Sequence, residues 1–399
     1  MVPAWLRLSI GAAATLFVGM GIGRFSYGPM IPALVETGAL SAAEAGYVGA
    51  GNLLGFLVGA VFALAITRRL GEAATLRLSL VVALACLMAS IAPWGFAWLA
   101  FWRFLVGAAV SIMMILCLVI VTRNAPPGRM GAATGTMFTG VGVAILLTGA
   151  TVPALLDWGL VVTWSGLALI GAAGAAVAFW GWRPLGRTGR VDGSAAPPLI
   201  ALRWSWTITG LVAARMFFTL GLIPHTLFWV DYLVRGLDRG IAFGGLQWTL
   251  FGLGAISGTY LWGRLADRIG FRAGLTLSFA AVACGVALPV LEPAVWALVA
   301  SSLVVGAQPG LTAIMGGRTH QLVGPQRMAT VSRWMALVAG IAQAVGGYAY
   351  VALFDAVRSY MPIFLIGGAA MAAGGIISWL LVERAITTGS RPGNPAPPG

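Results

Sequence analysis

The sequence predicts an all-α polytopic membrane protein with twelve transmembrane helices, arranged as two pseudo-symmetric bundles of six. Of its 399 residues, 59% are apolar and only 9% are charged, whereas soluble globular domains carry about 25% charged residues. The apolar residues form long continuous runs, and short arginine-containing segments separate these runs. A soluble fold could not cover its surface with so few charges, and disordered chains are poor in apolar residues.

Twelve apolar runs are each long enough for a helix that crosses the hydrocarbon core, which takes about 20 residues. The runs are continuous and lack the alternation of membrane-barrel strands, so we expect helices. The runs of the first half are Leu6–Val35, Ala43–Ile66, Ala74–Ala92, Ala97–Val121, Met130–Leu155 and Val161–Trp182. The runs of the second half are Trp204–Val234, Ile241–Ala266, Ala273–Leu291, Ala294–Met315, Met328–Phe354 and Met361–Val382.

The arginines predict the orientation of the chain in the membrane. The sequence has no lysine, so arginine supplies all 24 basic residues. If the N-terminus is cytoplasmic, eighteen arginines lie in inner loops and tails and three in outer loops. Because basic residues concentrate in cytoplasmic loops, both termini are predicted to be cytoplasmic. The remaining three, Arg24, Arg103 and Arg215, lie inside apolar runs.

The composition also argues against several functions. The net charge of +13 lies in short gaps between apolar runs, not on a soluble basic face, so we expect no nucleic-acid partner. The three cysteines, Cys86, Cys117 and Cys284, lie in apolar runs and are interpreted as small core residues. The chain contains no HExxH, no CxxC, no lysine-containing phosphate loop and no clustered carboxylates. We therefore expect no enzymatic activity, no metal and no cofactor.

The chain divides into two halves that resemble each other. We expect residues 1–182 and 204–382 to form the bundles, joined by a cytoplasmic linker at 183–203 and followed by a disordered cytoplasmic tail at 383–399. An offset of about 199 residues relates the halves. The matches pair Gly55 and Gly59 with Gly254 and Gly258, Arg69-Leu70-Gly71 with Arg268-Ile269-Gly270, and Gly107-Ala108 with Gly306-Ala307. A parallel repeat of this kind is a transporter architecture with its site near the midplane, although two glycine-rich halves could match by chance.

The most distinct motif ends the eighth run and reads GRLADRIGFR. Its glycines allow close helix approach and a tight turn. The motif resembles the loop signature of the major facilitator superfamily, found between the second and third helices of each half. The resemblance implies structural or gating roles for Gly263, Asp267, Arg268, Gly270 and Arg272. The first half has Arg68 where the second has Asp267, which argues against an acid-based inner gate in the first half.

Two further segments extend the resemblance over the whole chain. Arg103 precedes Gly107 by four positions in the fourth run, as in a superfamily motif, and Gly107 is therefore grouped with the gating residues. The fifth run lacks the Gly-Pro signature of drug/proton antiporters. The segments GIGRFSYGP at 21–29 and IPHTLFWVD at 223–231 look like the YbfB/YjiJ-type branch of bacterial facilitators. This resemblance implies the superfamily fold and no particular substrate.

The arginines within the membrane are the first candidates for a binding site, because intramembrane charges usually face a cavity or a partner. In the superfamily arrangement, Arg24, Arg103 and His225 would converge on the central cavity from both halves. A guanidinium binds a carboxylate through two parallel hydrogen bonds. The alternative is that Arg24 and Arg103 only satisfy backbone carbonyls. Arg215 could instead extend toward the inner surface or pair between helices.

His225 is the best single candidate for proton coupling, because imidazole changes charge near neutral pH. The alternative is a neutral histidine that donates to a carbonyl freed by Pro224. Asp231 is the second proton-coupling candidate; it could pair with Arg235 four residues on or form an outer gate. We favour the local pair. The other candidate cavity residues are polar or amphipathic side chains in apolar runs: Tyr27, Asn52, Trp229, Gln247, Trp248, Gln308, Trp334 and Gln343.

Together these features predict a multi-pass secondary transporter of the inner (plasma) membrane that works by alternating access. We expect a small-molecule substrate, most simply a small organic anion, with a proton as candidate co-substrate, and a monomer in the lipid bilayer. Efflux of amphipathic drug-like compounds is an alternative, since aromatic residues and methionines are plentiful. A non-transporting membrane receptor or scaffold is an alternative from another class.

Overall fold

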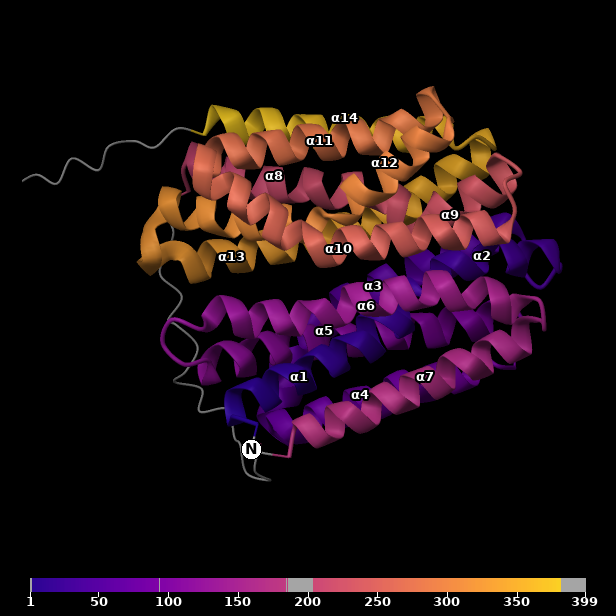
Figure 1. The fold of residues 1–399 in the computed structure, drawn as a ribbon, viewed down its shortest axis with the longest axis horizontal. Coiled ribbons are helices and arrows are strands. Elements are labelled where there is room, and N and C mark those ends of the chain that lie inside the picture. Colours follow the sequence, from indigo (N-terminus) through magenta and orange to yellow (C-terminus); the bar gives the residue numbers. More distant parts are fainter. Residues whose placement is uncertain (1, 93, 184, 186–203, 382–399) are drawn as a thin grey trace, which may run out of the picture.

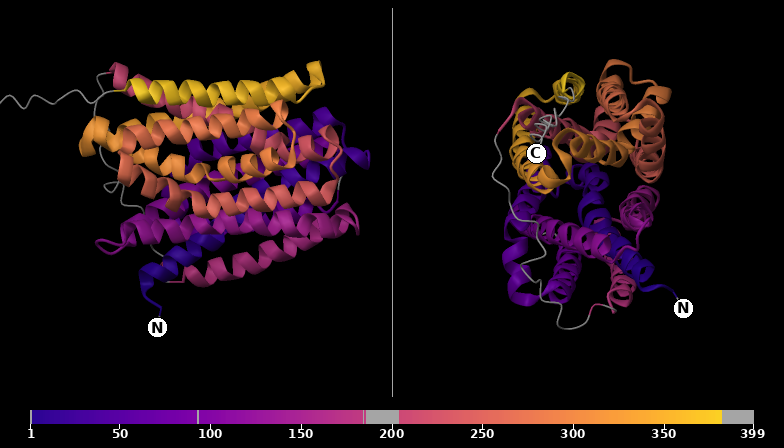
Figure 2. Two further views of the ribbon diagram at one scale, coloured as in Figure 1. Left: turned by 45° about the horizontal axis from the view of Figure 1, so that its top comes forward. Right: turned by 90° about the vertical axis from the view of Figure 1, so that its left-hand side faces the viewer.

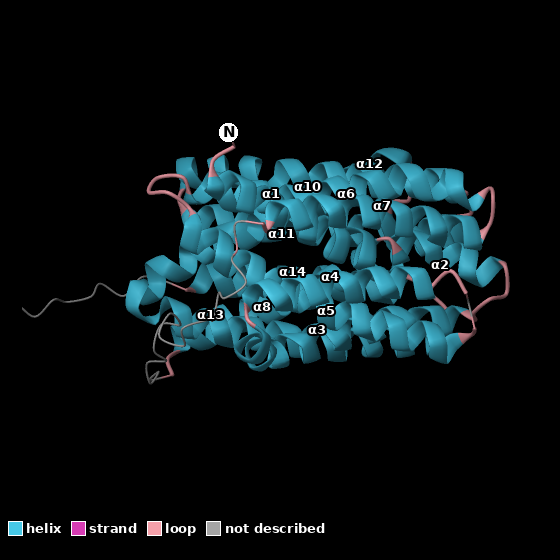
Figure 3. Ribbon diagram, turned by 90° about the horizontal axis from the view of Figure 1, so that it is seen from below, coloured by secondary structure: helices cyan, strands magenta, loops and turns pink. Residues whose placement is uncertain are grey.

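The computed structural model describes residues 2–92, 94–183, 185 and 204–381, and all regular elements in this part of the chain are helices (Figure 3). Figure 1 shows two groups of roughly parallel helices, the first half of the chain in indigo to magenta and the second in rose through orange to yellow. The end-on view in Figure 2 shows the same two groups side by side. The predicted all-α fold is confirmed.

The helices follow the apolar runs closely. The first half contains α1 (Ala4–Leu16), η1 (Phe17–Phe25), α2 (Tyr27–Glu36), α3 (Ala42–Leu70), α4 (Glu72–Ala89), α5 (Phe96–Asn124), α6 (Met130–Leu156) and α7 (Leu160–Gly181). The second half contains α8 (Trp206–Ile223), η3 (Pro224–Phe228), α9 (Trp229–Asp231), η4 (Tyr232–Gly236), α10 (Ile241–Ile269), α11 (Phe271–Leu291), α12 (Val295–Gly306), α13 (Gln308–Val357) and α14 (Met361–Leu380). Most of the predicted linker and the whole predicted tail lie outside the described residues.

Eleven helical segments of the described chain are long and apolar enough to cross a membrane. One of them, Val295–Val357, has 63 residues, which at 1.5 Å per residue is far longer than a hydrocarbon core of about 30 Å. Within it, Gly324 has φ 74° and ψ 168°, outside the helical region, and Pro325 follows. The predicted count of twelve requires this segment to cross twice with its turn at Gly324, and that count stays a prediction.

The first helix of each half changes from α-helical to π-helical winding near its middle. In the first half the π-helical segment is η1, and in the second half η3 begins at Pro224, which has no backbone N–H to continue the α-helical pattern. When the offset of about 199 residues is applied to the sequence, the end of η1 aligns with the start of η3. π-helical turns are frequent at functional sites. These two segments contain Arg24 and His225, so they mark this level of the bundles as a candidate functional site.

The two bundles meet closely where α6 runs beside α10, along the boundary between the two colour groups in Figure 1. A Cβ atom added to Gly149 would lie 2.5 Å from the backbone nitrogen of Thr249, and one added to Gly252 would meet the backbone of Leu146. A Cβ atom on Gly245 would meet Pro153. In membranes, where apolar surface gains little from leaving lipid, such small residues allow backbones to pack directly.

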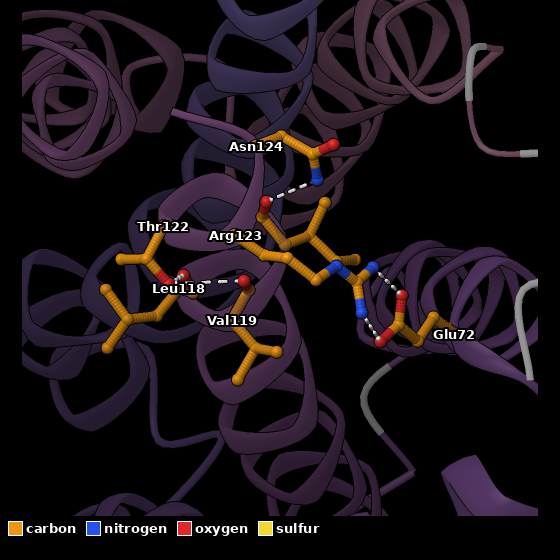
Figure 4. Close-up of polar contacts among 7 residues, drawn as sticks. Glu72, Leu118, Val119, Thr122, Arg123 and Asn124 are labelled. Atoms are coloured by element: carbon orange, nitrogen blue, oxygen red, sulfur yellow. Dashed lines mark hydrogen bonds and ion pairs between the residues drawn. The ribbon is translucent and has the colours of Figure 1, made fainter. Parts of the chain in front are cut away.

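An ion pair between a buried carboxylate and a half-exposed guanidinium joins two helices at the arginine-rich end of the first bundle (Figure 4). Glu72 begins α4 and is only 2% exposed, and Arg123 lies in the last turn of α5. The guanidinium donates two hydrogen bonds to the carboxylate, at 2.9 and 2.6 Å. Each charge also lies at the helix end that its sign favours. The pair therefore fixes the ends of α4 and α5 relative to each other.

We expect Arg123→Ala to destabilise the protein by about 1–3 kcal/mol, because it leaves the Glu72 carboxylate buried without its partner. The double variant Glu72→Gln/Arg123→Ala should recover part of this loss. Unfolding in mixed detergent micelles measures both. The control is Arg358→Ala, whose pair with Asp355 is exposed and should contribute under about 1 kcal/mol. Equal effects at the two sites would contradict a structural role for the Glu72–Arg123 pair.

Candidate functional site

A small cavity lies at the level of the π-helical segments, where the two bundles meet. Its walls come from η1, α2, α3 and α5 of the first half and from η3 of the second. The lining residues are Arg24, Phe25, Tyr27, Gly28, Gly49, Asn52, Leu53, Arg103, Thr226 and Leu227. Its volume is about 20 Å³, which is room for one water molecule. In this conformation the cavity is therefore closed to any organic molecule.

Arg24 is partly buried in η1 on the wall of this cavity. Its guanidinium lies over two aromatic rings, 5.4 Å from the centroid of Phe25 and 5.1 Å from that of Phe56. Within the described residues it forms no hydrogen bond or ion pair. Cation–π contacts compensate part of the cost of burying a charge, and they leave the N–H donors of Arg24 free for a ligand.

Arg103 also reaches the cavity, but its guanidinium is bound within the protein by one hydrogen bond and two aromatic rings. The side chain is 2% exposed and donates a hydrogen bond of 2.7 Å to the carbonyl of Gly23. Its guanidinium lies between the rings of Tyr27 and Trp164, at 5.0 and 4.7 Å from their centroids. The interpretation that Arg103 satisfies a backbone carbonyl thus matches the observed contact. Arg103 ties α5 to the residue that precedes Arg24.

Two of the predicted polar residues complete this wall. The Tyr27 hydroxyl donates to the carbonyl of Ala45 at 2.9 Å. The Asn52 side-chain N–H donates to the carbonyl of Arg103 at 2.9 Å, and its Oδ1 has no described partner. Gly107 allows this arrangement, because a Cβ atom there would meet the backbone of Asn52. The first half therefore builds most of the cavity by itself.

The second half closes the cavity on the side away from the arginine-rich end. The side chain of Leu227 fills the space beside Gly49, where a Cβ atom would collide with it. Trp248 of α10 lies beside Gly28 and contacts the ring of Phe25 with centroids 6.3 Å apart. Trp248 is completely buried. We call Leu227 and Trp248 the outer seal, because they lie on the side of the cavity that is predicted to face away from the cytoplasm.

His225 does not line this cavity, although the sequence predicted that it would converge with Arg24 and Arg103. It is fully buried inside the second bundle, stacked on Trp229 with centroids 4.5 Å apart. Its Nε2 lies 2.7 Å from Ser301 Oγ, and this hydroxyl donates to the carbonyl of Gly285 at 2.6 Å. Since the single hydroxyl proton is used there, Nε2 carries the ring proton and Nδ1 is an acceptor without a described partner.

Trp229 and Gln247 also lie inside the second bundle. The Trp229 indole N–H donates to Ser302 Oγ at 3.1 Å, and Ser302 donates to Gln247 Oε1 at 2.7 Å. Both Trp229 and Gln247 are completely buried. Neighbouring serines on α12 thus hold two separate polar chains that begin at His225 and at Trp229. None of these side chains reaches the small cavity.

Asp231 forms the local pair that the sequence favoured. Arg235 donates to both of its carboxylate oxygens, at 2.6 and 2.7 Å. The Tyr360 hydroxyl donates to Asp231 Oδ2 at 2.7 Å and so links this pair to the start of α14. Asp231 is 3% exposed. Its charge is therefore compensated within the second half by Arg235 and Tyr360.

The remaining predicted binding residues lie apart from the cavity. Arg215 contacts Phe218 and donates to Thr312 at 3.4 Å, a long hydrogen bond between α8 and α13. Trp334 is 40% exposed and contacts Trp204. Gln308 begins α13 and is partly buried, and Gln343 is partly buried with no described partner for its Nε2.

The loop motif adopts the turn that its glycines predicted. Gly270 has φ 85°, a conformation that glycine adopts without strain. Arg272 donates to the carbonyl of Trp379 at 2.9 and 2.6 Å and stacks on its ring, so it joins α11 to the end of α14. Asp267 and Arg268 are exposed and form no hydrogen bond or ion pair with the described residues.

Four features of the structure were not predicted from the sequence: the Glu72–Arg123 pair, the Gly23 carbonyl as an acceptor, Trp164, and the serine pair of α12. Glu72 directly follows the first-half loop motif, which is a signal that could have been used. The other groups become visible only through contacts between distant segments. Gly23, for example, receives a hydrogen bond from a residue 80 positions away.

The fold, with two helical bundles around a buried arginine at their boundary, is that of a multi-pass membrane transporter. The family comparison agrees: residues 16–379 match the family described as "Uncharacterised MFS-type transporter YbfB". The chain belongs to this family, which confirms the resemblance seen in its motifs. No curated protein matches the sequence.

We expect Gly49→Val to open the outer seal, because the added side chain would displace Leu227. The measurement is the reaction of a membrane-impermeant maleimide, added from the outer side, with a Leu53→Cys variant that lacks the native cysteines. Labelling should increase several-fold. Gly51→Val is the matched control, since a Cβ atom there would have no neighbour closer than 3.8 Å. Unchanged labelling in a well-folded Gly49→Val protein would exclude Leu227 as part of the seal.

Proposed function

We propose that this protein is a secondary transporter for a small organic anion, that it works by alternating access, and that Arg24 is the anion ligand. The observation that carries the proposal is a guanidinium on the cavity wall that has no acceptor among the described residues. A charge in the membrane interior usually has a partner or faces a cavity. A carboxylate would supply both the missing countercharge and two hydrogen-bond acceptors.

The neighbouring groups support this assignment. The nearby acid Asp231 is already bound to Arg235 and Tyr360, so it does not compensate the charge of Arg24. Arg103, which the sequence suggested as a second ligand, is occupied by the Gly23 carbonyl and two aromatic rings. We therefore propose Arg103 as the residue that positions η1, with Asn52 Oδ1 as a further acceptor for a ligand hydroxyl or ammonium group.

The rest of the cavity wall favours an organic over an inorganic anion. Phe25, Leu53 and Leu227 present apolar surface next to the guanidinium. Small-molecule sites combine mostly apolar walls with few polar groups that orient the ligand. Because the cavity has room for only about one water, the bundles must separate to admit a substrate. The observed conformation fits an empty, outwardly closed state of a bacterial inner-membrane protein.

His225 remains the candidate for proton coupling, acting from within the second bundle and not as a direct substrate ligand. With Nε2 donating to Ser301, its unpartnered Nδ1 is the atom that would accept a proton. A protonated ring donates from both nitrogens, which would require a new acceptor and a rearrangement of the packing against Trp229. A proton on His225 would in this way favour one conformation over the other.

Arg24→Ala should weaken the binding of the transported anion about ten- to hundredfold, since a charge-assisted hydrogen bond contributes roughly 1.5–3 kcal/mol. Arg24→Lys should retain part of the affinity, because it keeps the charge but not the planar pair of donors. The assay is the shift in melting temperature of purified protein with acetate, lactate, succinate and benzoate. Arg215→Ala is the control and should keep the full shift. Equal affinity in the Arg24→Ala protein would refute the assignment.

If His225 couples transport to protons, His225→Gln should abolish accumulation of the anion against its gradient while facilitated exchange continues. The glutamine amide nitrogen is as far from Cβ along the side chain as Nε2 of histidine, so it can still donate to Ser301 and the local packing should survive. The measurement is uptake into proteoliposomes with and without an imposed pH gradient, using an anion found by the melting-temperature assay. Accumulation with the normal pH dependence would remove His225 from the coupling mechanism.

A further inference from the structure

The contacts between α6 and α10 form a regular series of residue pairs, and we call each pair a rung. Gly245 meets Pro153, Thr249 meets Gly149, Gly252 meets Leu146, and Ile256 meets Gly142. From one pair to the next, the contact moves three or four residues toward the start of α6. It moves by the same number of residues toward the end of α10. The two antiparallel helices therefore keep one register along the whole contact, with a glycine in every rung.

Two helical turns beyond the last rung, the same register pairs Gly135 with Gly263. Here the glycines have a different environment. A Cβ atom added to either of them would meet nothing within 4 Å among the described residues, whereas at Gly142 it would lie 2.6 Å from Ile256. The close contact between α6 and α10 thus ends between Gly142 and Gly135, although the glycine pattern continues toward the arginine-rich end, which is the predicted cytoplasmic side.

The helical glycines that have no close neighbour all lie near one end of the described molecule. Four glycines with ordinary helical φ would meet nothing within 4 Å, namely Gly131, Gly135, Gly263 and Gly316. All four lie in the parts of α6, α10 and α13 that are nearest the arginine-rich loops. At the opposite end the bundles touch through the outer seal and through Val351, which lies beside Gly46.

We propose that Gly135 and Gly263 form a further rung that closes when the protein turns to its outward-open state. A glycine in an exposed helix interior costs about 1 kcal/mol relative to alanine, and neither position needs a glycine for packing in the observed state. Both have the residue that direct backbone contact requires. The α6–α10 contact therefore lengthens toward the cytoplasmic end as the outer seal opens. This inference rests on alternating access, but not on the identity of the substrate.

The test is disulfide formation in purified protein in lipid nanodiscs, with Cys86, Cys117 and Cys284 replaced by alanine. Copper phenanthroline is the oxidant, and a protease site inserted into residues 186–203 makes cross-linked halves visible on a gel. The Leu57→Cys/Gly340→Cys variant is the reference for the observed state. A Cβ atom on Gly340 would lie 4.0 Å from that of Leu57, within the range for a disulfide.

We expect the Gly135→Cys/Gly263→Cys variant to cross-link weakly, and its yield to rise several-fold when Gly49→Val opens the outer seal. Single-cysteine proteins set the background. If this pair stays at background in both proteins while the Leu57→Cys/Gly340→Cys pair reacts, the further rung does not exist. If the pair cross-links but the protein binds no carboxylate, the rung is supported and the anion proposal is rejected. Failure of the rung can therefore be told apart from failure of the proposed function.

A second variant covers the case in which Gly49→Val does not fold. Gly135→Leu adds bulk only where the observed state has space, so folded yield and melting temperature should be maintained. Because the rung could no longer close, maleimide labelling of Leu53→Cys from the outer side should fall several-fold. Val143→Leu, at a 45% exposed position of the same helix, is the control. Unchanged labelling in the Gly135→Leu protein would overturn the proposal.

Discussion

The hydrogen bond from Arg103 to the carbonyl of Gly23 connects the parts of this structure that matter for transport. A π-helical turn displaces backbone carbonyls from their usual partners, and in a membrane such groups must be satisfied within the protein. Arg103 satisfies one of them from α5. In turn its own backbone carbonyl accepts from Asn52 of α3. Three helices are thereby held at the level of Arg24, and the position of that guanidinium follows from this junction.

The two halves share the same helix geometry but place different polar side chains on it. Both first helices change to π-helical winding near the same repeat position, but one presents Arg24 to the bundle boundary and the other directs His225 into its own bundle. The loop motifs differ in the same way. The first half pairs Glu72 with Arg123, and the second half joins Arg272 to Trp379. The repeat therefore conserves helix geometry, while the side chains give the halves separate roles.

Hydropathy and arginine spacing were enough to predict the helices, because each crossing must satisfy its backbone internally and expose apolar side chains to lipid. The same reasoning identified Arg24 and the Asp231–Arg235 pair, which depend on local sequence. It could not place His225, because the π-helical winding of η3 is not evident from the sequence; Thr226 and Leu227 line the cavity, whereas the neighbouring His225 contacts Ser301 and Trp229 of its own bundle. Nor could it find the Gly23 acceptor or the seal at Gly49, since both depend on contacts between helices far apart in the sequence.

The water-sized cavity beside Arg24 has a consequence for the membrane as a permeability barrier. If a transporter had a large water-filled cavity in its empty state, protons and metal ions could use it as a path across the bilayer. Here the space has room for about one water, and a fixed positive charge lies on its wall. Arginines in narrow pores repel cations in the same way. The residue proposed to attract the cargo would also keep the empty protein from dissipating the ion gradients of the cell.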